Sequence, residues 1–518
     1  MKYFNLKIWS LIAALSLTTC TGDLDVVPID DDEITSATFF DSPEAFAQVL
    51  AKLYAGFTLT GQQGPAGQPD VAGIDEGFSS YLRMYWYHQE LTTDEAVIGW
   101  NDQTIQDFHQ HDWGSADLFI TGLYSRLFFQ ITLANEFIRQ ANNSSDATVK
   151  AYAAEARFVR ALSYWHALDL FENVPFVTEE DGIGAFLPAQ TNAQDLFAYI
   201  ESELLEIEPL MAEPGQDSYY ARADKGAVWM LLAKLYLNAE LHVGTPRYDD
   251  AITWLDKIVN SPAYSLDPNY DNLFRADNHT SNENIFVFSH DAKSQSFGGM
   301  NFVIHAAVGG NMAASDFGID GGWSGTRTTS AFVDLFEDQS GNSDTRANFH
   351  TPGQRKEIED IGVFTDGFAI TKFRNLTSGG SAGARGDFVD TDFALFRLAD
   401  AYLMYAEATL RGGNGSLSTA LGYINALRER AYGDSDNNIE QSDLNLDFII
   451  DERGRELYWE CHRRTDLRRF GLYTGGAYLW PWKGGVAEGR ATSNIYEIFP
   501  IPSADLAANP NLTQNPGY

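Results

Sequence analysis

Paired segments with apolar residues at helical spacing are the feature of this 518-residue chain that most restricts its fold. In AVWMLLAKLYLNAE (227–240), Trp229, Leu232 and Tyr236 recur three and four positions apart, which places them on one face of a helix. The segment YDDAITWLDKIVNSP (248–262) follows with the same kind of spacing and ends at a proline. Two amphipathic helices this close in sequence are expected to pack on each other.

The spacing matches the tetratricopeptide repeat, whose first helix reads W-x2-L-G-x2-Y. Ala233 replaces the glycine, and about six additional residues lengthen the turn between the two helices. Residues 402–431 repeat the unit, with Ala408 and Ala420 twelve positions apart, and residues 154–171 form a further apolar-periodic segment. We therefore predict a mainly α fold with a tetratricopeptide-like helical repeat scaffold. Unrelated amphipathic helices are the alternative.

Two other segments lack the helical period and are rich in Gly, Asn, Ser and Asp, namely residues 60–103 and about 285–386. Both place aromatic residues among polar ones. Loops of this kind usually carry function and not core. We predict that they form a loop-rich, irregular ligand-binding face beside the helical scaffold.

The N-terminus has the pattern of a secretory signal peptide, because Lys2 and Lys7 precede the apolar run 8–17. We predict that residues 1–19 are this signal peptide and that the protein is exported. Cys20 follows it directly in LTTC, which resembles the lipobox of bacterial lipoproteins, and we predict that Cys20 is lipidated. The only other cysteine is Cys461, so lipidation of Cys20 would leave no disulfide partner. Cys461 is then expected to be a small buried apolar residue.

Charge excludes one class of partner. The chain has 72 acidic and 35 basic residues and a net charge of −37, which would repel the phosphate backbone of a nucleic acid. Many of the arginines lie in one stretch, 448–471, which we expect to be helical and to contain Cys461. There Glu452 and Arg455, and likewise Arg453 and Glu456, stand three positions apart and are predicted to pair. We interpret the stretch as a structural charge ladder.

No catalytic motif stands out. Glycoside hydrolysis needs two carboxylates at a fixed separation, and with 72 acidic residues no spacing identifies such a pair. His109, His111 and Asp112 have no accompanying third ligand motif, and the calcium-like spacing of 434–438 lacks the glycine of an EF-hand, with Ile439 in its place. We predict no enzyme activity, no cofactor and no metal at the ligand site, and calcium at 434–438 stays open.

Four stretches spread over the mature chain resemble the SusD/RagB family of Bacteroidota outer-membrane lipoproteins: residues 154–177, 396–410, 449–471 and 499–518. The resemblance implies an N-terminal region at 20–284 and a C-terminal region at 285–518 on a helical scaffold. It also implies a lipid anchor at Cys20, a location on the outer membrane facing the cell exterior, and a SusC-like TonB-dependent transporter as partner. Members of this family bind glycans and do not cleave them.

The likeness is greatest to the starch-binding member of the family, whose site is an arc of aromatic rings flanked by polar groups. What it implies for this chain is an aromatic set of Trp323, Trp100 and Phe297 and a polar set of Asp75, Arg83 and Asn101. The implied function is capture of starch or maltooligosaccharides and delivery to the transporter. The alternatives are another polysaccharide, such as a β-glucan or fructan, and a peptide-binding helical-repeat protein.

Overall fold

The structure is a computed structural model that describes residues 39–65, 67–182, 184, 186–293 and 295–518. The predicted signal peptide and Cys20 lie outside these residues. The chain divides into two compact units, 1–48 and 49–518. The first includes the start of helix α3 (Pro43–Ala55), and all remaining elements belong to the second. The predicted division at residue 284 stays a prediction.

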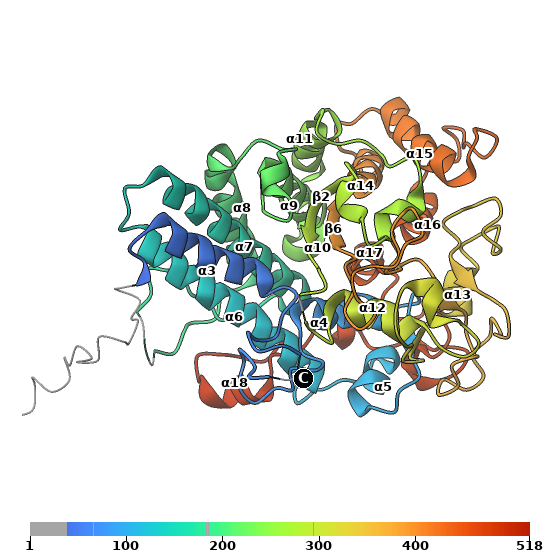
Figure 1. The fold of residues 1–518 in the computed structure, drawn as a ribbon, viewed down its shortest axis with the longest axis horizontal. Helices are drawn as coiled ribbons and strands as arrows, with labels where there is room; N and C mark the ends of the chain where they lie inside the picture. Colours follow the sequence, from blue (N-terminus) through green and yellow to red (C-terminus); the bar gives the residue numbers. More distant parts are fainter. Residues whose placement is uncertain (1–38, 66, 183, 185, 294) are drawn as a thin grey trace, which may run out of the picture. The chain divides into compact units, whose positions relative to one another are not determined.

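The described residues are mainly helical, as predicted (Figure 1). After α3 the α-helices are α4 (Tyr81–Trp86), α5 (Gln103–Gln110), α6 (Leu118–Ala141), α7 (Ala147–Phe171), α8 (Ala193–Ile207), α9 (Lys225–Leu237), α10 (Ala239–Val243), α11 (Tyr248–Val259), α12 (Gly299–Ala307), α13 (Ser330–Val333), α14 (Leu398–Leu410), α15 (Leu417–Tyr432), α16 (Leu446–Leu457), α17 (Arg463–Arg469) and α18 (Ser503–Ala508). The strands pair antiparallel as β1 (Val97–Ile98) with β3 (Thr326–Arg327), β2 (Asn284–Phe288) with β6 (Phe393–Arg397), and β4 (Phe349–His350) with β5 (Ala369–Ile370).

The long helices pack against one another almost in chain order, with α6 on α7, α7 on α8, α8 on α9, α9 on α11, α11 on α14 and α14 on α15 (Figure 1). Five of these helices, α6, α7, α8, α9 and α15, start with side chains that accept hydrogen bonds from backbone N–H groups of the first turn, which otherwise have no intrahelical partner. These N-cap residues are Asp117, Asp146, Asn192, Asp224 and Ser416. The predicted stack of helix pairs is confirmed.

The two helix pairs predicted from sequence are present as α9 with α11 and α14 with α15. Tyr236 and Leu255 are buried between neighbouring helices, as their spacing requires. Trp229 is only half-buried, and its indole N–H donates to the Glu208 carboxylate at 2.8 Å. The residues that lengthen the first turn form the short helix α10.

One helix lies where little helical period was expected. All nine residues of α12, GMNFVIHAA, are buried. A helix that is covered on every side needs no polar face, so its sequence lacks the amphipathic period by which surface helices are found. The other described residues between 289 and 386 are irregular apart from α13, a short 3-10 helix at Ala314–Phe317 and the two-residue strands, as predicted.

The arginine-rich stretch is not one helix. It folds as α16 and α17, and between them Trp459 and Cys461 have left-handed φ values of 62° and 65°. Two such non-glycine residues reverse the chain direction within a few positions and end the first helix. Cys461 is buried and has no disulfide partner, as expected.

Of the two predicted ion pairs in this stretch, one forms. Glu452 pairs with Arg455 at 2.7 Å. Arg453 does not pair with Glu456. Its guanidinium instead contacts Asp400 at 3.0 Å and Asp466 at 2.7 Å. Sequence spacing gives the neighbours within one helix, whereas these partners come from α14 and α17 and are brought in by helix packing.

The Glu456 carboxylate is the centre of a buried charge network. It accepts from Arg397 at 2.6 Å and from Arg430 at 2.5 Å, and these charged groups are buried. Burial by itself would raise the pKa of Glu456, but the adjacent guanidinium groups outweigh it and hold the pKa at about 2. Because the folded-state pKa lies below the unfolded value, these pairs stabilise the fold above about pH 4.3, and the contribution is lost as the pH falls towards 2.

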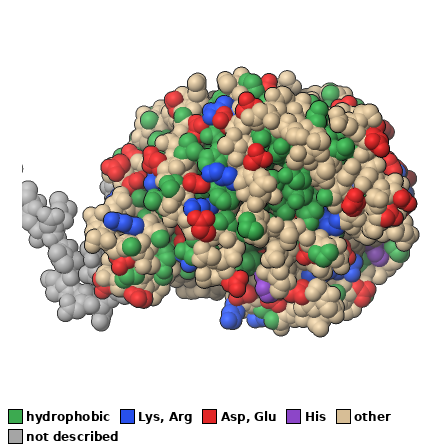
Figure 2. Space-filling view, turned by 90° about the horizontal axis from the view of Figure 1, so that it is seen from above, with side chains coloured by type: hydrophobic (Ala, Val, Ile, Leu, Met, Phe, Trp, Pro, Cys, Tyr) green, Lys and Arg blue, Asp and Glu red, His purple; other side chains and the backbone are tan. Residues whose placement is uncertain are grey.

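The surface is acidic because acidic residues outnumber basic ones by 72 to 35, and the buried arginines are accompanied by buried carboxylates. In the view of Figure 2, acidic side chains are spread widely over the molecule and basic ones are fewer. None of the described helices combines the length and the apolar character needed to cross a bilayer.

The first prediction concerns the buried network. Glu456→Gln should lower the free energy of unfolding by about 3–5 kcal/mol, because the buried guanidinium groups of Arg397 and Arg430 each lose one of the carboxylates that compensate their charge. Denaturant unfolding followed by circular dichroism measures the change.

The matched control is Glu206→Gln, which removes a carboxylate that lies 2.7 Å from Arg157 and whose side chain is 62% exposed. A solvated pair of this kind should cost less than about 1 kcal/mol. Similar losses in the two variants would contradict a special role for the buried network.

Candidate functional site

The β1–β3 ladder brings two distant tryptophans together. Val97 faces Arg327 and Ile98 faces Thr326, and just beyond the ladder the backbone N–H of Gly99 donates to the carbonyl of Gly325 at 3.1 Å. The next residue is Trp100, whose indole N–H donates to the carbonyl oxygen of Trp323 at 3.3 Å. Both tryptophans are half-buried.

Trp323 is held by His305 of α12. The imidazole stacks on the indole with 5.0 Å between ring centroids and 27° between planes, and the Trp323 backbone N–H donates to the His305 carbonyl at 2.7 Å. The imidazole Nδ1–H donates to the Gly321 carbonyl at 2.7 Å. Burial lowers the pKa of His305, so the ring beneath Trp323 is neutral at pH 7.

Arg83 of α4 joins the tryptophans to the neighbouring loops. Its guanidinium lies 4.5 Å from the ring centroid of Phe302 and 5.9 Å from that of Trp100. Nη1 donates to the carbonyls of Gly77 (3.0 Å) and Phe297 (3.4 Å), while Nη2 makes no hydrogen bond with the described residues. Arg83 therefore fixes two loops and retains one donor group.

Phe297 stands beside Arg83 because of the glycine that follows it. A Cβ on Gly298 would lie 1.8 Å from Ser80 Oγ, so only glycine lets this loop approach the N-terminus of α4 so closely. The Phe297 ring is 39% exposed and stacks on Phe388 with 6.0 Å between centroids. It is among the few large exposed apolar side chains of the described residues.

The two remaining predicted residues are exposed and polar. Asp75 accepts from the backbone N–H of Gly77 at 2.7 Å, and the carbonyl of the same glycine accepts from Arg83. Asn101 follows Trp100 directly, and its side-chain oxygen accepts from Gln106 at 2.8 Å. Asp75 thus belongs to the loop that Arg83 fixes, whereas Asn101 is connected to the cluster only through its neighbour in sequence.

The contacts join Trp323, Trp100, Arg83 and Phe297 into one group, which we call the aromatic cluster. Sequence reasoning missed three residues that support it: His305, Phe302 and Phe388. His305 and Phe302 lie in the wholly buried helix α12, where no pattern separates a supporting residue from an ordinary core residue. Phe388 follows a glycine and an aspartate in a loop, and only contact with Phe297 reveals its role.

The histidine pair considered from sequence is buried inside the fold. His111 donates from Nε2 to the Thr92 carbonyl at 2.8 Å, and its Nδ1 lies 3.1 Å from the Thr492 hydroxyl. Burial lowers the pKa of His109 to about 4. Among the described residues no group of three or more histidine, cysteine, aspartate or glutamate side chains could hold a metal ion.

This arrangement suits a ligand that presents both flat apolar faces and hydroxyl groups. Rigid aromatic rings offer large contact areas at small entropic cost. The exposed carboxylate of Asp75, the amide of Asn101 and the remaining donors of Arg83 can accept from and donate to hydroxyl groups.

Comparison with known proteins gives consistent results. A family model described as the SusD family matches residues 359–518. The chain is 36% identical to the starch-binding protein SusD of Bacteroides thetaiotaomicron, with 98% of each chain covered. It is 24% identical to a SusD-like protein of Bacteroides ovatus, with 88% of this chain and 80% of that protein covered.

Solved structures show the same fold. Surface glycan-binding protein A from Bacteroides thetaiotaomicron matches with a TM-score of 0.73 and 21% identity, over 93% of this chain and all of that chain. A structure of surface glycan-binding protein A from the same organism in complex with laminarihexaose matches with a TM-score of 0.70 and 20% identity, over 91% of this chain and 99% of that one.

The second prediction concerns the packing beneath Trp100. A Cβ on Gly325 would lie 2.6 Å from the Trp100 ring, so Gly325→Ala should displace the indole and lower the free energy of unfolding by about 1–3 kcal/mol. Denaturant unfolding measures the loss, and a red shift in tryptophan emission would report the displaced ring.

Gly321→Ala is the control in the same loop, since a Cβ there meets no atom within 4 Å. It should leave both stability and emission unchanged. An unchanged Gly325→Ala variant would mean that Trp100 is not packed against this glycine.

Proposed function

This chain belongs to the SusD family, and on that premise we propose that it binds starch and the α-glucan oligosaccharides derived from it. The observation that carries the proposal is the aromatic cluster. Trp100 and Trp323 are joined by a hydrogen bond, and Arg83 connects them to the exposed ring of Phe297. The identity of 36% to a starch-binding protein over 98% of the chain favours an α-glucan as the ligand.

The chemistry of sugars explains why such a cluster would bind a glycan. A pyranose ring has an apolar face of C–H groups and a rim of hydroxyl groups. Covering one face with an aromatic ring is worth roughly 1–2 kcal/mol by buried area. Two or three covered faces, less the cost of association, give a dissociation constant on the order of 0.1–1 mM. In this proposal Trp323, Trp100 and Phe297 cover the faces, and Asp75, Arg83 and Asn101 bind the hydroxyl groups.

The proposal is binding without cleavage. Glycosidases place two carboxyl groups on either side of the bond that breaks. Of the six residues proposed for the site, only Asp75 has a carboxylate, and it is exposed. The proposed site therefore holds the glycan and supplies no acid–base pair.

The peptide-binding alternative would use aromatic residues of the helical layer. Those residues already have polar partners there. Lys257 lies 4.0 Å from the ring centroid of Trp254 and 5.5 Å from that of Trp229, whose indole also donates to Glu208. The aromatic cluster instead lies on irregular chain, which favours the glycan.

The cellular role in this proposal follows the family. Cys20 carries a lipid that anchors the protein to the outer membrane, where it faces the cell exterior. There it captures glycan and delivers it to a SusC-like TonB-dependent transporter.

The third prediction tests the binding site. Trp323→Ala should weaken binding of maltoheptaose by about tenfold or more, because stacking on one ring supplies a large share of the small total binding free energy. Isothermal titration calorimetry of both proteins measures it, after circular dichroism has shown that both are folded. Phe297→Tyr is the conservative control and should change the affinity little.

Equal affinities of the wild type and Trp323→Ala would remove Trp323 from the site. Binding of a β-glucan or fructan with no heat from α-glucans would replace the proposed ligand. Reducing sugar released by the pure protein would contradict binding without cleavage.

The fourth prediction tests the anchor. Cys20→Ala should move the protein from the membrane fraction to the soluble fraction, because no other lipid attachment is proposed. Fractionation of expressing cells followed by immunoblotting measures this. Retention of the variant in the membrane fraction would contradict lipidation at Cys20, and co-purification of the wild type with a TonB-dependent transporter would support the proposed partner.

A further inference from the structure

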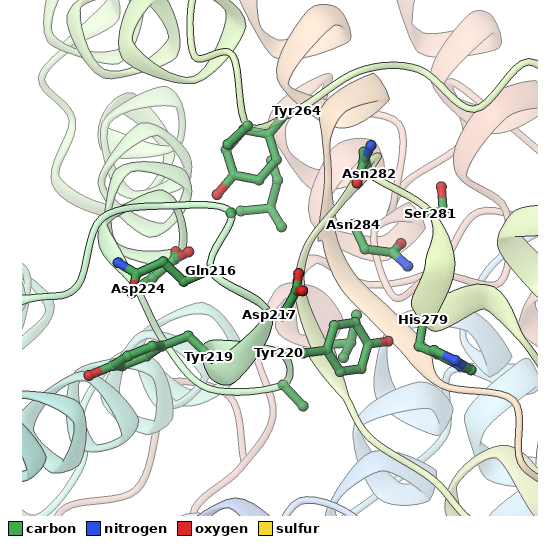
Figure 3. Close-up of a pocket in the computed structure, with 15 residues that line it drawn as sticks. Gln216, Asp217, Tyr219, Tyr220, Asp224, Tyr264, His279, Ser281, Asn282 and Asn284 are labelled. Carbon is green, nitrogen blue, oxygen red and sulfur yellow. The ribbon is translucent and has the colours of Figure 1, made fainter.

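A pocket with a volume of about 340 Å³ opens between the loop 215–221, residues 263–264 and the chain at 279–287 (Figure 3). None of the residues of the aromatic cluster lines it. Most of its lining comes from loops outside the two segments singled out from the sequence, and Asn284, Ile285 and Val287 come from β2.

The loop geometry is fixed by a glycine and by an anchored tyrosine. Gly215 has φ of +78°, and a Cβ there would lie 2.9 Å from the Cβ of Ala263, which brings the two walls into close approach. Opposite, the Tyr220 hydroxyl donates to Asp392 at 2.5 Å, and the same carboxylate accepts from the His290 backbone at 2.6 Å. The Tyr220 ring, 37% exposed, is therefore a preformed aromatic wall.

Two polar atoms of residues that line the pocket are unpaired. The Tyr264 hydroxyl and the Asn284 side-chain oxygen are both buried and have no hydrogen-bond partner among the described residues. Neither atom has an accessible surface, and the Tyr264 hydroxyl lies against Gly226 of α9, so both atoms belong to the packing behind the pocket wall and the ligand-facing surface is made by the other lining groups. Figure 3 shows both side chains on the pocket walls, with the Asp217 carboxylate between them.

The charges of the lining favour a neutral ligand. Its polar side chains are amides, hydroxyls, carboxylates and one histidine, and no described lining residue is a lysine or arginine. The nearby Arg222 pairs with Glu155 and stacks over Tyr219, so its charge is already engaged. A phosphate or a carboxylate would meet Asp217 and Asp224 without a cationic partner, whereas neutral hydroxyl groups can both donate to and accept from these groups.

We propose that this pocket is a second saccharide site, one that takes a neutral mono- or disaccharide. An aromatic wall at Tyr220 and Tyr264 with amide and carboxylate groups around it supplies the two kinds of contact that a sugar ring needs. The volume lies near the lower end of the range for ligand pockets, which suits one or two rings and excludes a long chain. The inference stands on the pocket's own lining and does not require the aromatic cluster to bind an α-glucan.

The test uses saturation-transfer difference NMR with glucose, maltose and cellobiose as probes. The full-length protein with Trp323→Ala is the background, so that the proposed first site contributes little. In this background Asn282→Trp should fill the mouth of the pocket, because Asn282 is exposed and its side chain makes no hydrogen bond with the described residues. We expect at least about a fivefold loss of the sugar signal, as for a ligand that loses most of its contact area.

Asn142→Trp is the matched control, since Asn142 is exposed at the end of α6 and does not line the pocket. It should leave the signal unchanged. Asp217→Ala removes an exposed carboxylate of the lining and should also weaken the signal, which keeps the test valid if Asn282→Trp fails to fold.

The outcomes separate the two sites. No sugar signal in the Trp323→Ala background, or a signal that neither Asn282→Trp nor Asp217→Ala reduces, would overturn the pocket proposal and leave the α-glucan proposal intact. A sugar signal that depends on the pocket, without any binding of maltoheptaose by the wild type, would overturn the α-glucan proposal and leave the pocket proposal intact. Glucuronate competing as well as glucose would contradict the neutral ligand class.

Discussion

The buried ion pairs around α16 and α17 are the constraint on which the rest of the structure depends. Glu456 binds Arg397 at the end of β6 and Arg430 in α15, so a strand and two helices meet at one carboxylate. A separate buried pair joins Arg463 of α17 to Asp94 at 2.7 Å. Charges buried in this way are costly unless each is paired, so the elements that carry them are held in one arrangement.

A short series of contacts connects these buried ion pairs to the aromatic cluster. Asp94 precedes β1, and its carbonyl accepts from the Thr329 hydroxyl at 2.6 Å, which ties the start of β1 to the chain just after β3. The β1–β3 ladder then sets Trp100 against Trp323, and α12 supports both from below. The irregular face is therefore anchored to the helical part by specific contacts, although it contains little regular structure.

The aromatic cluster and the pocket share a support. The Asp392 carboxylate that anchors Tyr220 at the pocket also accepts from the backbone of His290, whose ring in turn accepts from the Met300 backbone N–H at 3.2 Å. Met300 lies in the first turn of α12, three residues after the exposed ring of Phe297. The two proposed binding sites are thus connected through hydrogen bonds of residues that follow β2 and precede β6.

Local spacing in the sequence was sufficient for the helical layer, because residues such as Tyr236 and Leu255 repeat with the period of the helix that buries them. Family resemblance was sufficient to propose Trp323 and its neighbours. What only the tertiary structure decided is which distant groups meet: Arg453 pairs with aspartates of two other helices, and His305 supports Trp323 from a helix without any periodic signal. The physical reason is that sequence period reports which side of an element faces the core, while ion pairs and ring contacts between elements depend on how those elements pack.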